Sequence, residues 1–393
     1  MVNELAYALI TPYSLMKSRT GGIIGRLIAH SRLTLVGVRM FIFSDEFLEA
    51  FKEILCPPNM EPVMREAWLR YLDENLRRQN PWGFVPRCML LLFSGPNAVK
   101  HLKDDVIGSF TEQIQGDTVR GTYGDFIRGG DGALRYFEPA VVTAPSSELN
   151  VEHLRLLARY DADGGILTGR CTYPSGKVET ALVILKPDNF ERPTRRPGNI
   201  IDVFSRTGLR IVGTRLFNMT VAQAEEFYGP LKEMFTTRLK PNLTQEVYTR
   251  LQNAFAFPFT MLDADHVADT LAGRNAIAEF NRIVEYMTGV NPDEITDPAQ
   301  KKTASRSRCL AVLYEGVDAI SKIRKFLGST DPTKADPATV RSEFGRDLMR
   351  NGAHASDSPA SAERERKIIG MWQETEGSDI QQMISQYIAT RGK

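Results

Sequence analysis

The sequence predicts an α/β protein made of two similar layered domains. Short apolar runs of strand length alternate with stretches of helical periodicity, a pattern typical of helices that cover a sheet. One block of the chain also recurs, because residues 33–41 (LTLVGVRMF) match residues 209–217 (LRIVGTRLF). A length of 393 residues favours the same division, since a single core seldom grows that large.

The repeat extends on both sides of this block. At the same offset, Gly22 falls on Gly198, and at a longer offset residues 118–120 match residues 339–341. One fold that occurs twice, with an added segment in the second copy, accounts for both offsets. We therefore predict domains at 1–160 and 177–393, with the added segment at about 236–306.

Each copy is expected to run strand, helix, strand, helix, twice over. The first copy opens with an apolar run around Leu5–Ile10, which we interpret as a strand and not a signal peptide because Glu4 precedes it and no basic leader occurs. In the second copy we expect strands at 180–185, 209–217, 309–314 and 344–349, and helices at 199–205, 221–235 and 317–327. Further helices are expected at 245–255, 264–271 and 276–287, and in the tail at 379–388.

Composition narrows the class of protein. About 42% of the residues are hydrophobic and 25% are charged, as in an ordinary globular protein. A net charge of +1 gives no reason to expect a nucleic acid partner, and no apolar run reaches the roughly 20 residues of a membrane helix. The four cysteines are scattered without metal or redox spacing, which predicts reduced thiols and a cytoplasmic location.

Residues 350–358 (RNGAHASDS) carry the candidate chemistry. His354 follows the predicted strand at 344–349 and precedes a predicted helix that Ser358 caps and Pro359 opens. A histidine held between a strand and a helix start suits a nucleophile or a general base. A loop histidine without a chemical role is the alternative for a residue of this type.

This segment resembles the active-site segment of the nucleoside diphosphate kinases. In that family a strand leads into Arg-Asn-x-x-His-Gly-Ser-Asp-Ser, and a helix with Ser-Ala-x-x-Glu follows. Residues 361–365 supply the second part, and Ala355 stands where the family has glycine. The resemblance implies an α+β architecture of two ferredoxin-like domains, each with a four-stranded antiparallel sheet, and a helical insertion in the second.

The resemblance also implies roles for other residues of the second copy. Lys186 would contact the terminal phosphate, Tyr228 would approach His354, and Glu365 would hold one imidazole nitrogen so that the other can attack. The remaining nucleotide contacts would come from Arg324, Thr330, Arg341 and Asn351, the last of them to the ribose. Mg²⁺ would arrive with ATP, bound mainly by the nucleotide phosphates. Taken singly, each of these side chains also fits an ordinary surface or core role.

Two features of the second copy leave alternatives open. The insertion replaces the family's short helical lid, so the aromatic residue that stacks on the base is unassigned among Phe255, Phe257 and Phe259. The sequence 263–269 (DADHVAD) is either a metal cluster or, as we favour, a capped helix start with a solvated acidic face.

The first copy lacks the chemical residues. Thr11 stands where the second copy has Lys186, and no histidine lies between His101 and His153. Arg120 matches Arg341, and Lys103 falls on Arg324, so a weak anion pocket could survive. We expect this copy to be a structural partner that forms an intramolecular pseudo-dimer, within a chain that could assemble further as a homo-oligomer.

The expected function is transfer of the γ-phosphate of ATP to nucleoside diphosphates through a phosphohistidine on His354. Two alternatives remain open at this point. The fold could serve nucleotide sensing or assembly without catalysis, which the remodelled lid and Ala355 favour. The phosphate could also pass from His354 to a protein. Membrane association is not expected.

Overall fold

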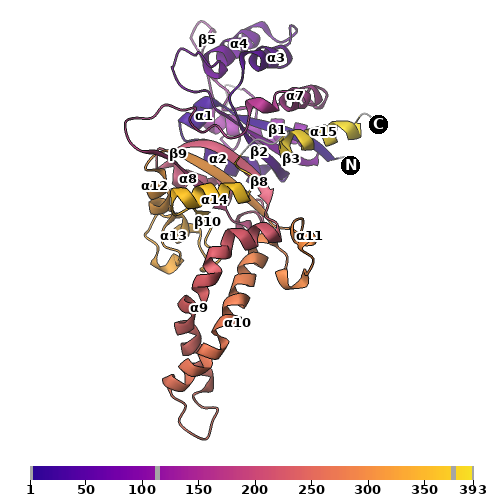
Figure 1. Ribbon diagram of the computed structural model, residues 1–393. Coiled ribbons are helices and arrows are strands. Elements are labelled where there is room, and N and C mark those ends of the chain that lie inside the picture. The colour runs from indigo at the N-terminus through magenta and orange to yellow at the C-terminus, as the bar shows by residue number, and fades with distance from the viewer. Residues whose placement is uncertain (1–2, 111–115, 373–377, 392–393) are drawn as a thin grey trace. The chain divides into compact units, whose positions relative to one another are not determined.

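The computed structural model describes residues 3–110, 116–372 and 378–391 (Figure 1). It divides into two compact units, Met1–Leu216 with Leu310–Lys393, and Phe217–Cys309. Within the described residues no helix combines the length and apolar character needed to cross a membrane.

The first unit contains two four-stranded sheets with the same internal arrangement. The first has the order β2-β3-β1-β6 and the second the order β8-β9-β7-β10. The strands of the first sheet are β1 (Asn3–Ile10), β2 (Thr34–Phe41), β3 (Cys88–Pro96) and β6 (Val141–Val142). Those of the second are β7 (Val178–Leu185), β8 (Arg210–Asn218), β9 (Arg308–Val317) and β10 (Ala353–Ala355). The antiparallel four-stranded sheets predicted for both halves are therefore confirmed.

Helices and one small ribbon complete the first half of the chain. The helices are α1 (Pro12–Met16), α2 (Thr20–Ser31), α3 (Asp45–Leu55), α4 (Pro62–Leu76), α5 (Ala98–Lys100), α6 (Val119–Tyr123) and α7 (Ser147–Arg159), with the π-helix η1 (His101–Ile107) and the 3-10 turn η2 (Asp161–Asp163). The ribbon pairs β4 (Asp125–Arg128) with β5 (Leu134–Glu138).

The second half has its own set of helices between and after its strands. They are η3 (Pro187–Asn189), α8 (Arg196–Ser205), α12 (Ala319–Leu327), η5 (Pro332–Lys334), α13 (Val340–Phe344), α14 (Pro359–Ile368) and α15 (Asp379–Arg391). The tail helix α15 packs on α7 and β2 of the first half, where Ile380 and Ile384 are buried.

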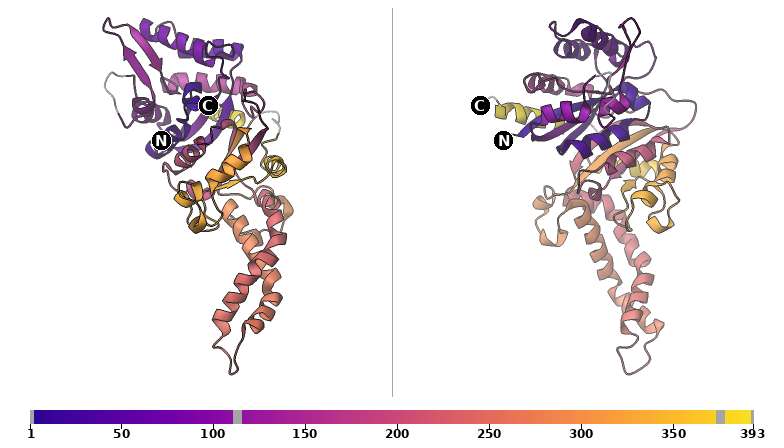
Figure 2. Two further views of the ribbon diagram at one scale, coloured as in Figure 1. Left: turned by 90° about the vertical axis from the view of Figure 1, so that its left-hand side faces the viewer. Right: turned by 180° about the vertical axis from the view of Figure 1, so that it is seen from behind.

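The two halves of this unit meet where α2 packs against α8 (Figures 1 and 2). A Cβ atom at Gly198 would overlap the carbonyl oxygen of Gly21 and the backbone of Gly25, and one at Gly21 would overlap the carbonyl oxygen of Gly198. The helices therefore cross with their backbones in contact, which only glycine allows. Of the two glycines that recur in the sequence repeat, Gly198 lies in this crossing, whereas Gly22 packs against Tyr123.

The second unit is a helical hairpin of α9 (Val221–Leu251) and α10 (Met261–Thr288), followed by η4 (Pro292–Glu294) and α11 (Pro298–Lys301). Its helices run side by side in both views of Figure 2. Thr220 and Thr260 cap the two helices with reciprocal hydrogen bonds. The buried face of α10 carries Ala264, Ala268, Ala272 and Ala276, small residues that let the helices approach closely.

Three expectations about elements were wrong. The strand predicted at 344–349 does not exist, because α13 ends at Phe344 and the extended segment is β10, which contains His354 itself. The separate helices predicted at 221–235 and 245–255 are parts of the single helix α9, and those at 264–271 and 276–287 are parts of α10. Packing of α9 against α10 outweighs the helix-breaking tendency of Pro230 and Pro241 inside α9.

Candidate functional site

His354 lies at the middle of β10, opposite Ile184 of β7. Its side chain is 23% exposed, so the ring is fixed by the sheet while part of it reaches solvent. Its Nε2 atom lies 2.9 Å from Oε2 of Glu365. If the neutral ring donates through Nε2, its lone pair lies on Nδ1, which is the tautomer required for attack through Nδ1.

Glu365 comes from α14, which begins as the sequence predicts, with Ser358 as the cap and Pro359 in the first turn. The carboxyl is buried at 4% exposure. Its Oε2 atom also accepts a hydrogen bond of 2.6 Å from the hydroxyl of Ser356. Ser356 thus orients the group that orients His354, a role that sequence analysis missed although the residue lies within the recognised motif.

Lys186 follows β7 directly and is nearly buried, at 9% exposure. Its ammonium donates to the carbonyl oxygen of Met349 at 2.9 Å and to Oδ1 of Asn351 at 2.7 Å. The backbone N–H of Lys186 donates to the carbonyl oxygen of Gly352, which continues the β7–β10 pairing. Because Leu185 pairs with Ala353, the lysine and His354 are anchored at the same end of the sheet.

Asn351 connects Lys186 to the segment that carries the predicted phosphate contacts. It is 1% exposed, and its Nδ2 atom donates to the carbonyl oxygens of Thr330 and Leu348, each at 3.0 Å. Such a fully engaged amide positions the surrounding backbone. The structure thus gives Asn351 a structural task beside the ribose contact that the resemblance implies.

Arg341 and Thr330 form the next link of the same network. The Arg341 guanidinium donates to the carbonyl oxygen of Gly328 at 3.0 Å and to the hydroxyl of Thr330 at 3.3 Å. Gly328 has a φ of +86°, so a side chain there would be strained. Lys186, Asn351, Thr330 and Arg341 are therefore joined by consecutive hydrogen bonds.

Arg324 is exposed on α12, a helix that contacts β10. The pKa of Asp357 is lowered first by the hydrogen bond from Ser361 and further by the positive charge of Arg324. This electrostatic effect relates Arg324 to the segment that follows His354. The second half of the first unit thus brings seven of the eight predicted site residues to one region of the fold.

Tyr228, the eighth predicted site residue, belongs to the second unit. It is 7% exposed on α9, and its ring centroid lies 4.9 Å from that of Phe227. Its approach to His354 stays a prediction. In the same unit, Phe255 and Phe257 are exposed while Phe259 is buried, so the first two fit a stacking role better.

The acidic sequence at 263–269 is a helix start. Asp263 accepts a hydrogen bond from the N–H of Thr260, which caps α10, and both Asp265 and Asp269 pair with Lys240, at 3.1 Å and 2.6 Å. Among the residues that the structure describes, no group of three or more metal-ligating side chains occurs.

The corresponding region of the first sheet has different residues. The N–H of Thr11 donates to the carbonyl oxygen of Ala140, as that of Lys186 does to Gly352, and this correspondence places Val142 where the second sheet has His354. His153 of α7 takes the position of Glu365 and pairs through Nδ1 with the Tyr7 hydroxyl at 2.7 Å. The first sheet therefore has no histidine nucleophile at the position that corresponds to His354.

Arg120 also differs from its counterpart Arg341, although both donate to the carbonyl oxygen of a glycine at the end of a helix. The Arg120 guanidinium also donates to the carbonyl oxygen of Val141 and lies 4.0 Å from the ring centroid of Phe110. Burial lowers the pKa of Arg120 to about 9. The hydrogen bonds of Arg120 go to backbone carbonyls in the core. Arg120 therefore does not support the weak anion pocket expected in the first copy.

Comparison with known proteins finds relatives of the segment that contains His354. A family model described as nucleoside diphosphate kinase matches residues 179–284 and 297–374. A nucleoside diphosphate kinase of Methanobrevibacter smithii is 30% identical over 192 residues, which cover 49% of this chain and 87% of that protein. The chain belongs to the nucleoside diphosphate kinase family.

Other family members match a similar span. The chloroplastic nucleoside diphosphate kinase 2 of Pisum sativum is 25% identical over 229 residues, covering 58% of this chain and 71% of the relative. The crystal structure of an NDP kinase from Pyrobaculum aerophilum is 26% identical, covers 51% of this chain and 98% of its own, and has a TM-score of 0.34. The residues that the family model matches, 179–284 and 297–374, lie in the half of the chain that holds His354.

Proposed function

We propose that the chain is a nucleoside diphosphate kinase that transfers the γ-phosphate of ATP to nucleoside diphosphates through a phosphohistidine on His354. The observation that carries the proposal is the 2.9 Å contact between Nε2 of His354 and the buried carboxyl of Glu365. That contact favours the Nδ1 lone pair as the nucleophile and stabilises the ring as it gains positive charge. Family membership supports the same reaction.

The surrounding residues suit an in-line transfer. Nδ1 of His354 would attack the γ-phosphorus as the bond to the β-phosphate oxygen breaks, and ADP would leave. Lys186, Arg324, Arg341 and Thr330 would stabilise charge on the transferring oxygens. A nucleoside diphosphate would then take the phosphoryl group by the reverse chemistry. Mg²⁺ bound to the nucleotide phosphates would neutralise part of their charge.

We also propose that residues 1–160 and 177–393 are two domains of one origin that form an intramolecular pseudo-dimer. Their sheets share one strand order, and the helices α2 and α8 cross at glycines, with Gly198 against Gly21 and Gly25. The first domain, with Val142 at the histidine position, would act as a structural partner. Size-exclusion chromatography with light scattering would show whether pseudo-dimers assemble further into a homo-oligomer.

Ala355, which stands where the family has glycine, is compatible with catalysis in this structure. Ala355 pairs with Val183 in extended β10, and it is not among the described residues with positive φ. A glycine is therefore not required at this position by backbone conformation. Sensing or assembly without catalysis, and transfer to a protein, become outcomes of the test below.

The decisive experiment labels the full chain with ATP carrying a tagged γ-phosphate and Mg²⁺, beside His354→Ala. We expect an acid-labile, base-stable label that is absent from the variant and is discharged by GDP or CDP. A label that no diphosphate discharges would indicate a protein acceptor. A folded chain that binds nucleotide but takes no label would contradict the enzyme and favour a sensor or scaffold.

The cysteines are the feature of the chain that bears on its cellular location. The four scattered cysteines, all of them described residues, form no disulfide, which supports a cytoplasmic protein, whereas two relatives are named as chloroplastic. We keep the cytoplasm as the prediction, and imaging of a tagged full-length chain in its own cells would check it.

A further inference from the structure

The first unit contains a cavity of about 540 Å³ away from the predicted phosphoryl-transfer residues. It lies between α1, α4, β5 and the loop after α4, and its size falls in the range of small-molecule sites. The residues that carry the argument are Tyr71, Asn75, Trp82, Tyr136 and Glu138. All of them belong to the half of the chain outside the family match.

Glu138 is the most unusual group of this cavity. It is a carboxyl with only 2% exposure, and three hydrogen bonds end on the same oxygen, Oε1. They come from the Thr11 hydroxyl at 3.0 Å, the Tyr71 hydroxyl at 3.1 Å and the N–H of Ala140 at 2.8 Å. Within the part of the chain that the structure describes, Oε2 receives no hydrogen bond. Oε2 is not itself fully buried and Glu138 lines the cavity, so a molecule bound there can donate a hydrogen bond to this oxygen.

Asn75 adds a second acceptor to the same cavity. It is 9% exposed, and its Nδ2 atom donates to the carbonyl oxygen of Tyr71 at 3.1 Å. Its Oδ1 atom has no donor among the described residues. Two acceptor atoms without a donor among the described residues therefore line the cavity, and a ligand with N–H donors could bind both.

Aromatic and basic side chains line the rest of the cavity. Tyr136 and Trp82 are exposed, Trp82 at 64%, and Tyr13 and Phe84 also contribute to the lining. Exposed rings at a concave surface suit a planar ligand. Lys17 and Arg70 are exposed lining residues, and neither has an ion pair with a carboxylate among the described residues.

We propose that this cavity binds a small planar aromatic compound that donates an N–H to Glu138 and carries an anionic group near Lys17 and Arg70. Burial raises the pKa of the Glu138 carboxyl to about 7, so the carboxylate form that accepts at both oxygens gains population above that pH. The site is independent of the proposed kinase reaction.

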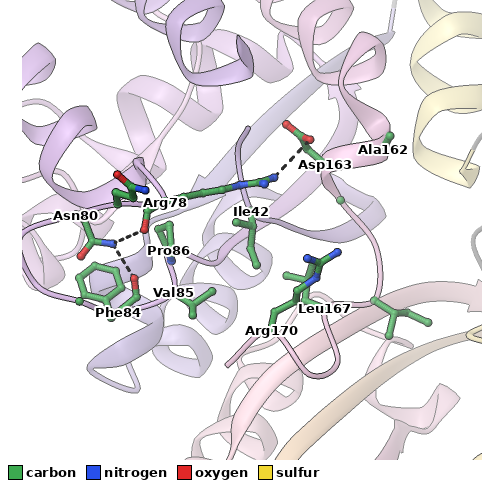
Figure 3. A pocket seen from close by; sticks show the side chains of 14 residues that line it. Ile42, Arg78, Asn80, Phe84, Val85, Pro86, Ala162, Asp163, Leu167 and Arg170 are labelled. Carbon is green, nitrogen blue, oxygen red and sulfur yellow. Dashed lines mark hydrogen bonds and ion pairs between the residues drawn. The ribbon is translucent and has the colours of Figure 1, made fainter. Parts of the chain in front are cut away.

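A second cavity, of about 440 Å³, is a weaker candidate (Figure 3). There Arg78 reaches toward Asp163, with 4.0 Å between their charged atoms, and the amide of Asn80 donates to the carbonyl oxygen of Phe84 at 2.7 Å. Those polar lining groups therefore already interact with other groups of the protein. The cavity beside Glu138 differs because Oε2 of Glu138 and Oδ1 of Asn75 have no donor among the described residues.

The test is calorimetric titration of the full chain with indole-3-acetate at about pH 8, above the pKa of Glu138. The matched probe is 1-methylindole-3-acetate, which keeps the ring and the anion but lacks the N–H. We expect the methylated probe to bind at least about 10-fold more weakly, since a hydrogen bond to a carboxylate is worth that much.

Three variants locate the site. Glu138→Gln and Trp82→Ala should each weaken binding of indole-3-acetate about 10-fold, and Lys186→Ala should leave it unchanged. Trp82 is exposed, so its variant keeps the test valid if Glu138→Gln fails to fold. Equal binding of both probes, unchanged binding in Trp82→Ala, or no binding of indole-3-acetate up to about 5 mM would overturn the proposal.

Discussion

At the scale of single residues, the site depends on which neighbours hold each side chain. A histidine near the end of a strand is not unusual by itself. His354 differs from a loop histidine because it contacts the buried carboxyl of Glu365, which also accepts a hydrogen bond from the Ser356 hydroxyl. Lys186 is likewise distinguished by its two acceptors. These contacts lead to predictions for individual substitutions.

Glu365→Ala should lower kcat for phosphoryl transfer by roughly 10- to 100-fold, because a hydrogen bond to a charged group is worth about 1.5–3 kcal/mol. The measurement is the rate of His354 labelling under single-turnover conditions. Glu363→Ala is the matched control, since Glu363 lies on the same helix, is exposed and pairs with Lys367 at 2.7 Å. An equal loss in both variants would contradict a specific role for Glu365.

Asn351→Ala should destabilise the fold by roughly 1–3 kcal/mol, because it removes the amide donor of two backbone carbonyls and one of the acceptors of the Lys186 ammonium. Urea unfolding followed by circular dichroism measures this change. A stability equal to that of the parent would show that Asn351 serves only the nucleotide.

His153 should make stability depend on pH. Burial lowers its pKa to about 4, whereas the unfolded chain has the ordinary value of about 6.5. The neutral ring therefore stabilises the fold fully above about pH 6.5, and this contribution is lost as pH falls toward 4. Between pH 7.5 and 5, the parent should lose about 2 kcal/mol more unfolding free energy than His153→Gln. Identical losses in denaturant titrations at the two pH values would refute this account.

At the scale of elements, close contacts between helices explain features that residue types alone do not. The α2–α8 crossing depends on glycines, and the α9–α10 hairpin depends on a face of alanines. In both cases small residues let backbones approach, so that dispersion contacts accumulate along the helices.

Gly198→Ala should destabilise the chain by roughly 1–3 kcal/mol, because its Cβ atom has no space beside the backbone of α2. Gly273→Ala is the control, since a Cβ atom there meets nothing within 4 Å and alanine favours the helix by up to about 1 kcal/mol. Thermal unfolding should move in opposite directions for the two variants. A shift of the same sign in both would argue against the tight crossing.

At the scale of the first unit, the tail connects parts that are distant in sequence. Ser378 donates to Asp161 at 2.5 Å, and Asp379 pairs with Arg215 at 2.7 Å. Ile384 of α15 is fully buried where the tail helix packs against the first half. The helix therefore links both halves of the repeat.

Ile384→Ala should cost roughly 2–5 kcal/mol of unfolding free energy, the usual result of a large-to-small change in a core. Ser385→Ala, on the exposed side of the same helix, should change stability by less than about 0.5 kcal/mol. If chemical denaturation found both variants equal to the parent, α15 would not be part of the folded core.

The sequence by itself determined the class of fold, the repeat, and the segment that carries the candidate chemistry. Local signals suffice for these, since apolar periodicity marks β7 and α12, and Ser358 with Pro359 marks the start of α14. The motif around His354 also gave Glu365 as the orienting group, which the structure places within hydrogen-bond distance.

Only the tertiary structure decided what depends on contacts between distant segments. Apolar periodicity placed a strand at 344–349, but pairing with β7 selects Ala353–Ala355 because the backbone of Lys186 and Ser356 bonds across that register. Packing joined predicted helix pieces into α9 and α10. The acceptor atoms of Glu138 and Asn75 that have no donor line one cavity only because β5 packs near α4. Neither segment alone predicts which hydrogen bonds form between them.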